Sequence, residues 1–214
     1  DFLDLPLRTT YSRLYQNDGT GVFTDVTVNT GLDQVLPAMG CNFGDLDNDG
    51  FPDFYLGTGA PDFRAVVPNL MFKNDAGERF KNVTYAGGFG HIQKGHGISF
   101  ADVNNDGDQD IYAVMGGSVS GDVFQNAFFE NPGNDNHWLS LRLEGTSANR
   151  SAIGARIRLR VVDGNGERFI YHTVNSGGSF GANSLQAEIG LGASVDEVSL
   201  SVIWPDGNVK WVEY

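Results

Sequence analysis

The stretch Asp45-Leu46-Asp47-Asn48-Asp49-Gly50-Phe51-Pro52-Asp53 decides the local fold, and Asp102-Val103-Asn104-Asn105-Asp106-Gly107-Asp108-Gln109-Asp110 repeats its pattern 57 positions later. Positions 1, 3, 5 and 9 carry side-chain oxygens, and position 7 offers its backbone carbonyl. Glycine at position 6 permits the sharp turn that wraps these oxygens around one hard cation. The pattern predicts two calcium loops. Because four carboxylates crowd together in the first loop, ion binding and local folding should be coupled there.

The loops are not EF-hands. An EF-hand requires a bidentate glutamate at position 12, but that position is Leu56 in the first loop and Ala113 in the second, and neither loop is flanked by a helical pattern. The alternative is a metal-free surface turn, since Asp, Asn and Gly are common in turns. Two loops in the same register favour metal sites over that alternative.

The loops belong to an internal repeat, which shows when the chain is shifted along itself by 57 residues. Residues of like type then meet without a gap, among them Tyr15 with Phe72, Phe23 with Phe80, Phe43 with Phe100 and Tyr55 with Tyr112. A third copy begins at Phe124 and then loses the pattern. Repeats of this length are typical of stacked or radial arrays in which each unit buries its apolar face on the next.

Each repeat reads as four short strands. In the first, residues 14–17 and 23–26 flank a hairpin turn, and residues 39–43 and 53–56 flank the first calcium loop. This pattern predicts an all-β fold with β-propeller blades at about 11–67 and 68–124, plus a partial third strand set. We expect the recurring aromatic residues to be core rather than a sugar-binding platform; these are Phe23, Phe43, Phe54, Phe80, Phe100 and Tyr112.

Residues 13–27 and 44–53 resemble the FG-GAP/VCBS repeat of integrin-type propellers, and the resemblance spans about residues 11–126. It implies that each loop holds one Ca²⁺, about two ions per chain. The implied ligands of the first ion are Asp45, Asp47, Asp49, the Phe51 carbonyl and Asp53. Those of the second are Asp102, Asn104, Asp106, the Asp108 carbonyl and Asp110. Asn104 at position 3 lowers the ligand charge by one, which should weaken the second site.

The remainder of the chain resembles the ASPIC/UnbV domain that follows such repeats in cartilage acidic protein and in bacterial secreted proteins. The resemblance rests on residues 136–139, 147–157, 190–192 and 204–207. Strand-like runs at 137–143, 155–161, 169–174, 185–189, 195–203 and 209–211 predict a small antiparallel sandwich or barrel. We therefore divide the chain into calcium-binding repeats at 1–128 and an ASPIC/UnbV-like β domain at 129–214.

Composition limits the partners and the location. The net charge is −13, and two bound Ca²⁺ ions would leave −9, which disfavours nucleic acid and anionic membranes. No segment approaches the roughly 20 apolar residues of a membrane span. With the single Cys41 no disulfide can form within the chain, and we expect this residue to be a small buried hydrophobe. Weak calcium loops need millimolar calcium, which favours an extracellular, cell-surface or periplasmic location.

Two blades cannot close a propeller of roughly four to eight blades. The chain is then a C-terminal piece of a longer protein, an incomplete one, or a subunit whose open blade edges pair with neighbours. A start at Asp1 without Met or a signal peptide, directly ahead of a mid-propeller motif, favours the first of these.

The candidates for catalysis are weak. Residues 177–181 match G-x-S-x-G, but a nucleophile elbow needs a strand before it and a helix after it, and residues 183–190 read as a turn and a strand. We expect a glycine-rich loop there. None of the histidines has a zinc motif or a triad partner that the sequence identifies; these are His91, His96, His137 and His172. Hairpin packing is the expected role of Trp138, Trp204 and Trp211, with an exposed stacking residue for a carbohydrate as the alternative. Asn82 and Asn149 fit the N-glycosylation pattern, which is short enough to occur by chance.

The sequence therefore predicts a secreted, non-enzymatic calcium-binding module for adhesion, matrix contact or extracellular assembly. Its ligand would be an unidentified protein or glycan. Open blade edges add the hypothesis of a self-assembling fibre subunit. The alternative is a carbohydrate-binding accessory part of a larger polysaccharide-active enzyme, and a purely structural spacer is a third hypothesis.

Overall fold

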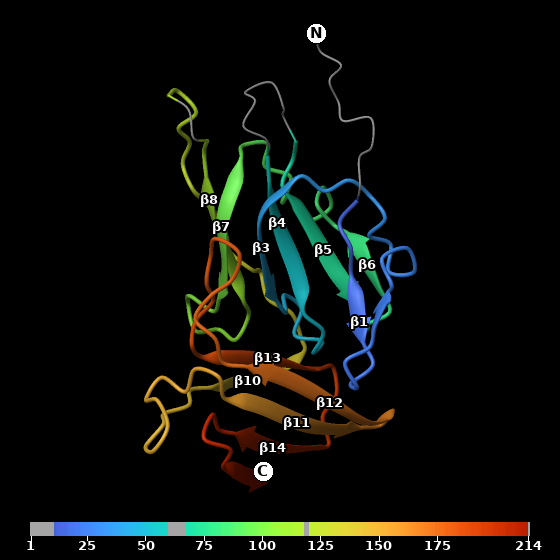
Figure 1. Cartoon of the computed structure of the whole chain (residues 1–214), viewed down its shortest axis with the longest axis vertical. Helices are drawn as coiled ribbons and strands as arrows, with labels where there is room; N and C mark the ends of the chain where they lie inside the picture. The colour runs from blue at the N-terminus through green and yellow to red at the C-terminus, as the bar shows by residue number, and fades with distance from the viewer. Residues whose placement is uncertain (1–10, 60–66, 118–119, 214) are drawn as a thin grey trace.

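The computed structural model describes residues 11–59, 67–117 and 120–213, and these residues form strands and turns without a helix. The all-β prediction is confirmed. Figure 1 shows sheets side by side in the upper part and a second group of strands below them. The strands are β1 (Tyr15–Asn17), β2 (Phe23–Asp25), β3 (Ala38–Gly44), β4 (Asp53–Thr58), β5 (Leu70–Asp75), β6 (Arg79–Asn82), β7 (Gly95–Ala101), β8 (Asp110–Met115), β9 (Ala127–Phe129), β10 (His137–Leu141), β11 (Arg156–Asp163), β12 (Gly166–Thr173), β13 (Ala187–Gly192), β14 (Glu197–Ile203) and β15 (Val209–Glu213).

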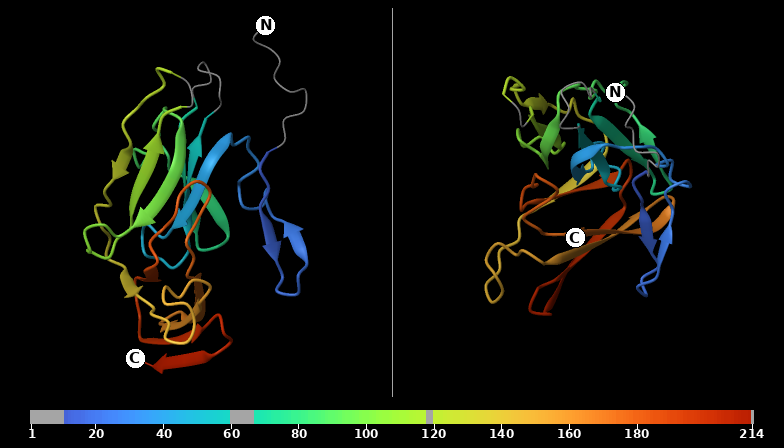
Figure 2. Two further views of the ribbon diagram at one scale, coloured as in Figure 1. Left: turned by 60° about the vertical axis from the view of Figure 1, so that its left-hand side comes forward. Right: turned by 45° about the horizontal axis from the view of Figure 1, so that its top comes forward.

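The N-terminal strands form three antiparallel units: the hairpin β1-β2, the sheet β3-β4-β5-β6 and the sheet β7-β8-β9. They resemble blades, and across the described residues they do not close into a ring or barrel. The expected grouping of four strands within residues 11–67 is wrong, because β3 and β4 pair with β5 and β6 of the next repeat. The hairpin β1-β2, which aligns with β5-β6, stands apart from the sheet in Figure 2. The repeat in sequence is thus offset from the sheet by two strands.

The C-terminal strands form a small two-sheet sandwich, which we call the sandwich (β10–β15). One sheet is β10-β13, and the other, β12-β11-β14-β15, is open at its edges. Alternate residues of β11, among them Ile157 and Leu159, pack with Ile189 of β13 in a shared core. Turns at residues 163–166 and 205–208 join β11 to β12 and β14 to β15, as the sequence predicts. The predicted boundary after residue 128 falls within β9, which pairs with β8.

The prediction of a uniform aromatic core is only partly right. Phe54 and Phe100 are 6% and 0% exposed, but Phe43 at the repeat position of Phe100 is 54% exposed. Phe23 and Tyr112 are also exposed, at 61% and 43%. A side chain on a sheet face is buried only where another sheet covers it; Phe23 belongs to the lone hairpin β1-β2, and Phe43 faces that hairpin rather than a full sheet.

The glycine-rich segment (residues 175–183) extends from the sandwich to the blade-like sheets, and Figure 1 shows it as the orange loop beside β7. The Ser179 N–H donates to the Cys41 carbonyl of β3 at 3.3 Å. A Cβ at Gly181 would overlap the backbone of Ile98 in β7. No helix follows, so the predicted glycine-rich loop is confirmed, and its glycines permit backbone to approach backbone.

Candidate metal centre

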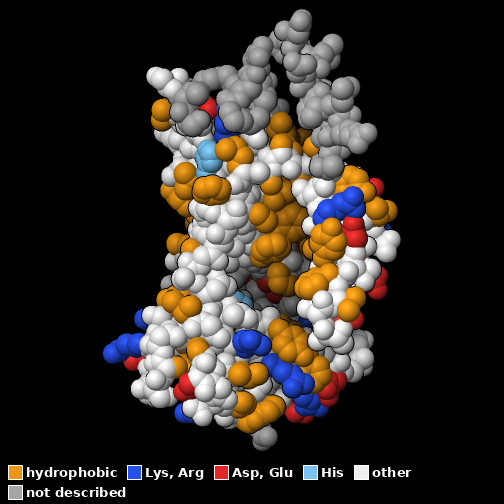
Figure 3. Space-filling model, in the orientation of Figure 1, with side chains coloured by type: hydrophobic (Ala, Val, Ile, Leu, Met, Phe, Trp, Pro, Cys, Tyr) orange, Lys and Arg blue, Asp and Glu red, His pale blue; other side chains and the backbone are white. Residues whose placement is uncertain are grey.

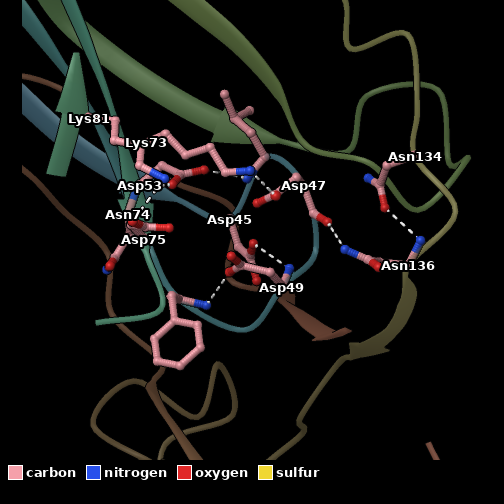
Figure 4. A network of polar contacts seen from close by, with 12 residues as sticks. Asp45, Asp47, Asp49, Asp53, Lys73, Asn74, Asp75, Lys81, Asn134 and Asn136 are labelled. Atoms are coloured by element: carbon pink, nitrogen blue, oxygen red, sulfur yellow. Dashed lines mark hydrogen bonds and ion pairs between the residues drawn. The ribbon is translucent and has the colours of Figure 1, made fainter. Parts of the chain in front are cut away.

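The first loop (residues 45–53) joins β3 to β4, two adjacent antiparallel strands, as the sequence predicts. Its first three acidic residues converge. One carboxylate oxygen from each of Asp45, Asp47 and Asp49 lies within 4.8 Å of the others, and Figure 4 shows these side chains gathered inside the loop. Three oxygens at this separation can close around one cation of the size of Ca²⁺.

Hydrogen bonds inside the loop hold this arrangement. The Asp45 carboxylate accepts from the backbone N–H groups of Asp49 at 3.1 Å and Gly50 at 2.8 Å. The Asp49 carboxylate accepts from the Phe51 N–H at 2.8 Å. Asn48 and Gly50 adopt left-handed conformations, with φ of 55° and 92°. Asn and Gly tolerate this region better than other residues, so the Asn-Asp-Gly sequence sets the turn.

Asp53 has a different role from the first three carboxylates. It is 1% exposed. Its two oxygens accept from the backbone N–H groups of Leu46 at 3.0 Å and Asn74 at 2.7 Å. Asp53 therefore connects the start of the loop to β5. It does not belong to the convergent group of Asp45, Asp47 and Asp49. Its role as a calcium ligand, like that of the Phe51 carbonyl, stays a prediction.

Electrostatics in the first loop oppose four free negative charges. Burial, with a smaller contribution from neighbouring aspartates, raises the pKa of Asp45 and of Asp53 to about 7. Burial also raises the pKa of Asp49. Lys73 of β5 forms an ion pair with Asp47 and partly offsets the charge. A divalent cation would neutralise these carboxylates far more completely, since desolvated like charges repel strongly.

The first loop also holds an oxygen that no protein group satisfies. Asp47 Oδ1 is buried and has no hydrogen-bond partner, although the other oxygen of the same carboxylate pairs with Lys73. A buried acceptor without a partner is costly unless an ion or water fills the gap. The donor set is made of oxygens alone, which suits a hard cation such as Ca²⁺ better than Zn²⁺. The residues present therefore fit the implied metal.

The second loop (residues 102–110) joins β7 to β8 and repeats the geometry of the first. Asp102 accepts from the N–H groups of Asp106 at 3.1 Å and Gly107 at 3.0 Å. Asp110 accepts from Val103 at 3.2 Å and from Asn131 at 2.8 Å, as Asp53 does from Leu46 and Asn74. At Asn105 and Gly107 φ is 63° and 95°. Backbone and anchoring carboxylates thus follow the same plan in both loops.

Position 3 distinguishes the second loop. Asn104 replaces the carboxylate, and its Nδ2 donates to Asp106 at 2.7 Å. Within the described residues the second loop has no group of three convergent carboxylates. Asp108, predicted to contribute its carbonyl, uses its side chain to accept from Asn48 of the first loop at 3.0 Å. The predicted order of affinity, with the second site weaker, stays a prediction.

Two kinds of contact at the first loop were missed by the sequence analysis. Lys73 aligns with Gln16 in the repeat, so the alignment does contain a change of charge at this position. The other contacts come from the sandwich, where Asn136 and Arg168 donate to loop carbonyls. They lie 89 and 119 residues from their partners, and no local pattern signals such a pairing.

Two models of known protein families match parts of the chain. A chain of blade-like antiparallel sheets, two of which carry an acidic loop between adjacent strands, followed by a β-sandwich is an all-β repeat protein. The model of an FG-GAP-like repeat matches residues 7–56, which include the whole first loop. The model of the ASPIC and UnbV domain matches residues 145–214. This protein thus combines an FG-GAP-like repeat with a C-terminal ASPIC/UnbV domain, and the predicted resemblance is confirmed.

FG-GAP repeats are typical of extracellular proteins. Through the described ranges, the fold has no helix with the length and apolar character of a membrane span. No curated protein matches the chain. The evidence for the second repeat is the alignment at a shift of 57 residues and the equivalent hydrogen bonds within the two loops.

Proposed function

We propose that this chain is a non-catalytic, calcium-stabilised module of a secreted or cell-surface protein. The observation that supports calcium most directly is the first loop, where carboxylate oxygens of three aspartates converge and a buried oxygen of Asp47 has no hydrogen-bond partner. The ion would complete the turns that join the first two strands of each blade-like sheet, β3 to β4 and β7 to β8. Its role would be structural, because the loops hold the strand ends rather than face a substrate.

The expected role of the module is adhesion, matrix contact or extracellular assembly through its sheets. Two features support it. The strand β9 forms the edge of its sheet. Large apolar side chains are also exposed on the units flanking the central sheet, among them Phe23 and Tyr112. Such surfaces bind other protein surfaces or strand edges. Light scattering in millimolar calcium tests assembly, and a clean monomer at high concentration would count against a fibre subunit.

Thermal unfolding with and without calcium tests the metal sites. At a free concentration 100-fold above the dissociation constant, one site stabilises the folded state by about 2.7 kcal/mol. For a chain of this size we expect a rise in melting temperature of roughly 5–10 °C per site. Metal analysis should find about two ions per chain, and one fewer in Asp49→Ala. If calcium changes neither quantity, the loops are acidic turns and the proposal is wrong.

A hollow between the sheets and the sandwich supports the second candidate function, carbohydrate binding. It has a volume of about 500 Å³ and lies between β3 and β12, and Figure 3 shows the surface hollowed between the two parts. Phe43 and Tyr171, 54% and 69% exposed, line it together with the side chains of Asn42 and Asn175. Aromatic rings and amides are suited to sugar faces and hydroxyls. Calorimetry with a panel of polysaccharides tests this candidate, and saturable binding lost in Tyr171→Ala would favour it over adhesion.

A further inference from the structure

The outer side of the first loop is bound by the sandwich. Three consecutive backbone carbonyls, those of residues 47–49, each accept a hydrogen bond from it. The donors are Asn136 Nδ2 at 2.6 Å, Gly192 N at 2.8 Å and Arg168 Nη1 at 3.0 Å. Figure 4 shows Asn136 beside the Asp47 carbonyl, on the side away from the carboxylates. Asp47 and Asp49 therefore direct carboxylates into the loop while their carbonyls, and that of Asn48, accept from the sandwich side.

The two parts approach each other too closely for side chains to intervene. A Cβ at Gly190 of β13 would overlap the Asn48 backbone and the Asp45 carboxylate. On the other side of the contact, a Cβ at Gly50 would lie 2.6 Å from Arg168 Nη1. At Gly190, glycine lets the backbone of β13 pack directly on the backbone of the loop, and at Gly50 it leaves room for the Arg168 side chain. Such a surface fits one conformation of the loop and is lost when that conformation changes.

The sandwich also contacts the second loop. Asn48 donates through Nδ2 to the Gly107 carbonyl at 3.1 Å, which joins the two loops directly. Trp138 packs against Gly107, where any Cβ would overlap the indole ring. Glu188 of β13 accepts from the Asp102 N–H at 3.2 Å. The sandwich therefore spans both loops and holds them in a fixed relation.

We propose that calcium binding in the first loop and docking of the sandwich are coupled, and that Gly190 and Arg168 are positioning residues for the ion. This inference rests on the proposed calcium site. An ion draws Asp45, Asp47 and Asp49 together and fixes the turn, and the sandwich binds the outside of that same turn. Because binding free energies are linked, the docked sandwich must raise the affinity for calcium by the same factor that calcium strengthens docking.

The test measures calcium affinity of the first loop alone by titration calorimetry. Asp106→Ala, made in the full chain, removes the second site and leaves one ion to titrate. In this background Gly190→Ala inserts a methyl group between the sandwich and the loop, and because that methyl would also meet the Asp45 carboxylate, Asn136→Ala, which only removes a donor to the Asp47 carbonyl, is measured beside it. Gly164→Ala is the matched control, since Gly164 lies in the same sandwich with nothing within 4 Å of an added Cβ. We expect at least a tenfold loss of affinity in Gly190→Ala and no change in Gly164→Ala.

The outcomes separate this inference from the proposed function. If the Asp106→Ala chain binds no calcium, the proposed site itself is wrong. If it binds calcium and the two glycine variants have equal affinity, the site stands and the coupling is refuted. Asn136→Ala, in the same background, removes a neutral donor to the Asp47 carbonyl without changing charge or adding bulk near the carboxylates; it should also lose affinity, and it serves if Gly190→Ala does not fold. Small-angle X-ray scattering of the unsubstituted chain gives a further readout: its radius of gyration should increase when calcium is removed, and an unchanged radius would contradict the coupling.

Discussion

The ion-free protein should become more stable when the pH is lowered from 8 to 5.5, which is opposite to the usual effect of titrating carboxylates. Burial raises the pKa of Asp45 and of Asp53 to about 7, from 3.8. Between pH 3.8 and about pH 7, these two carboxyl groups are still protonated in the folded chain but already ionised in the unfolded chain. The free energy of unfolding therefore falls as the pH rises from about 4 to about 7, and the penalty is complete above pH 7.

The size of the effect follows from these pKa values. One pKa unit corresponds to about 1.4 kcal/mol, so the full penalty for one such group is about 4 kcal/mol. Between pH 8 and pH 5.5 about 2 kcal/mol of it is relieved. Because protonation of one carboxylate removes the repulsion felt by the other, we expect about this value for the whole loop rather than twice as much. For a chain of this size it corresponds to a rise of roughly 4–8 °C in melting temperature.

The assay is thermal unfolding in metal-depleted buffer at pH 5.5 and pH 8, compared with millimolar calcium at both values. Calcium should remove most of the dependence of melting temperature on pH, because the bound ion neutralises the carboxylates in place of the protons. Asp45→Asn keeps one acceptor oxygen without a charge, and its ion-free form should be more stable than the unsubstituted chain at pH 8. The reasoning is refuted if the ion-free melting temperature falls on acidification, or if calcium stabilises the chain equally at both pH values.

Three further predictions follow from the contacts. Lys73→Met should tighten calcium binding roughly two- to fivefold in calorimetry, because the ammonium no longer competes for its carboxylate, and should lower the ion-free melting temperature. Ser179→Ala should leave the melting temperature within about 1 °C and calcium affinity unchanged, and loss of an activity in that variant would overturn the non-enzyme proposal. Phe100→Ala should cost about 3–5 kcal/mol in denaturant unfolding and Phe43→Ala far less, because only Phe100 is fully buried; equal costs would contradict this.

Local patterns in the sequence predicted the loops and most strands. The calcium-loop pattern of residues 45–53 lies within nine consecutive residues, so it can be recognised from the sequence alone. The structure places this segment between two paired strands, as expected. The six C-terminal runs also became strands, because alternation and turn residues act over a few positions. The contact between Arg168 and the Asp49 carbonyl could not be predicted in this way, since it depends on how two separately folded parts meet.

Phe43 and Phe100 show why an exact repeat in sequence does not determine burial. Both precede an acidic loop at the same position of the repeat, in β3 and β7. The ring of Phe100 lies against Gly44 of the preceding sheet, so closely that a Cβ at Gly44 would overlap it. Phe43 faces the hairpin β1-β2, which does not cover it. Its ring lines an apolar groove rather than a closed core. A side chain at position 44 would displace the Phe100 ring, because only a residue without a side chain leaves room for it, and Phe43 has no such neighbour to cover it among the described residues.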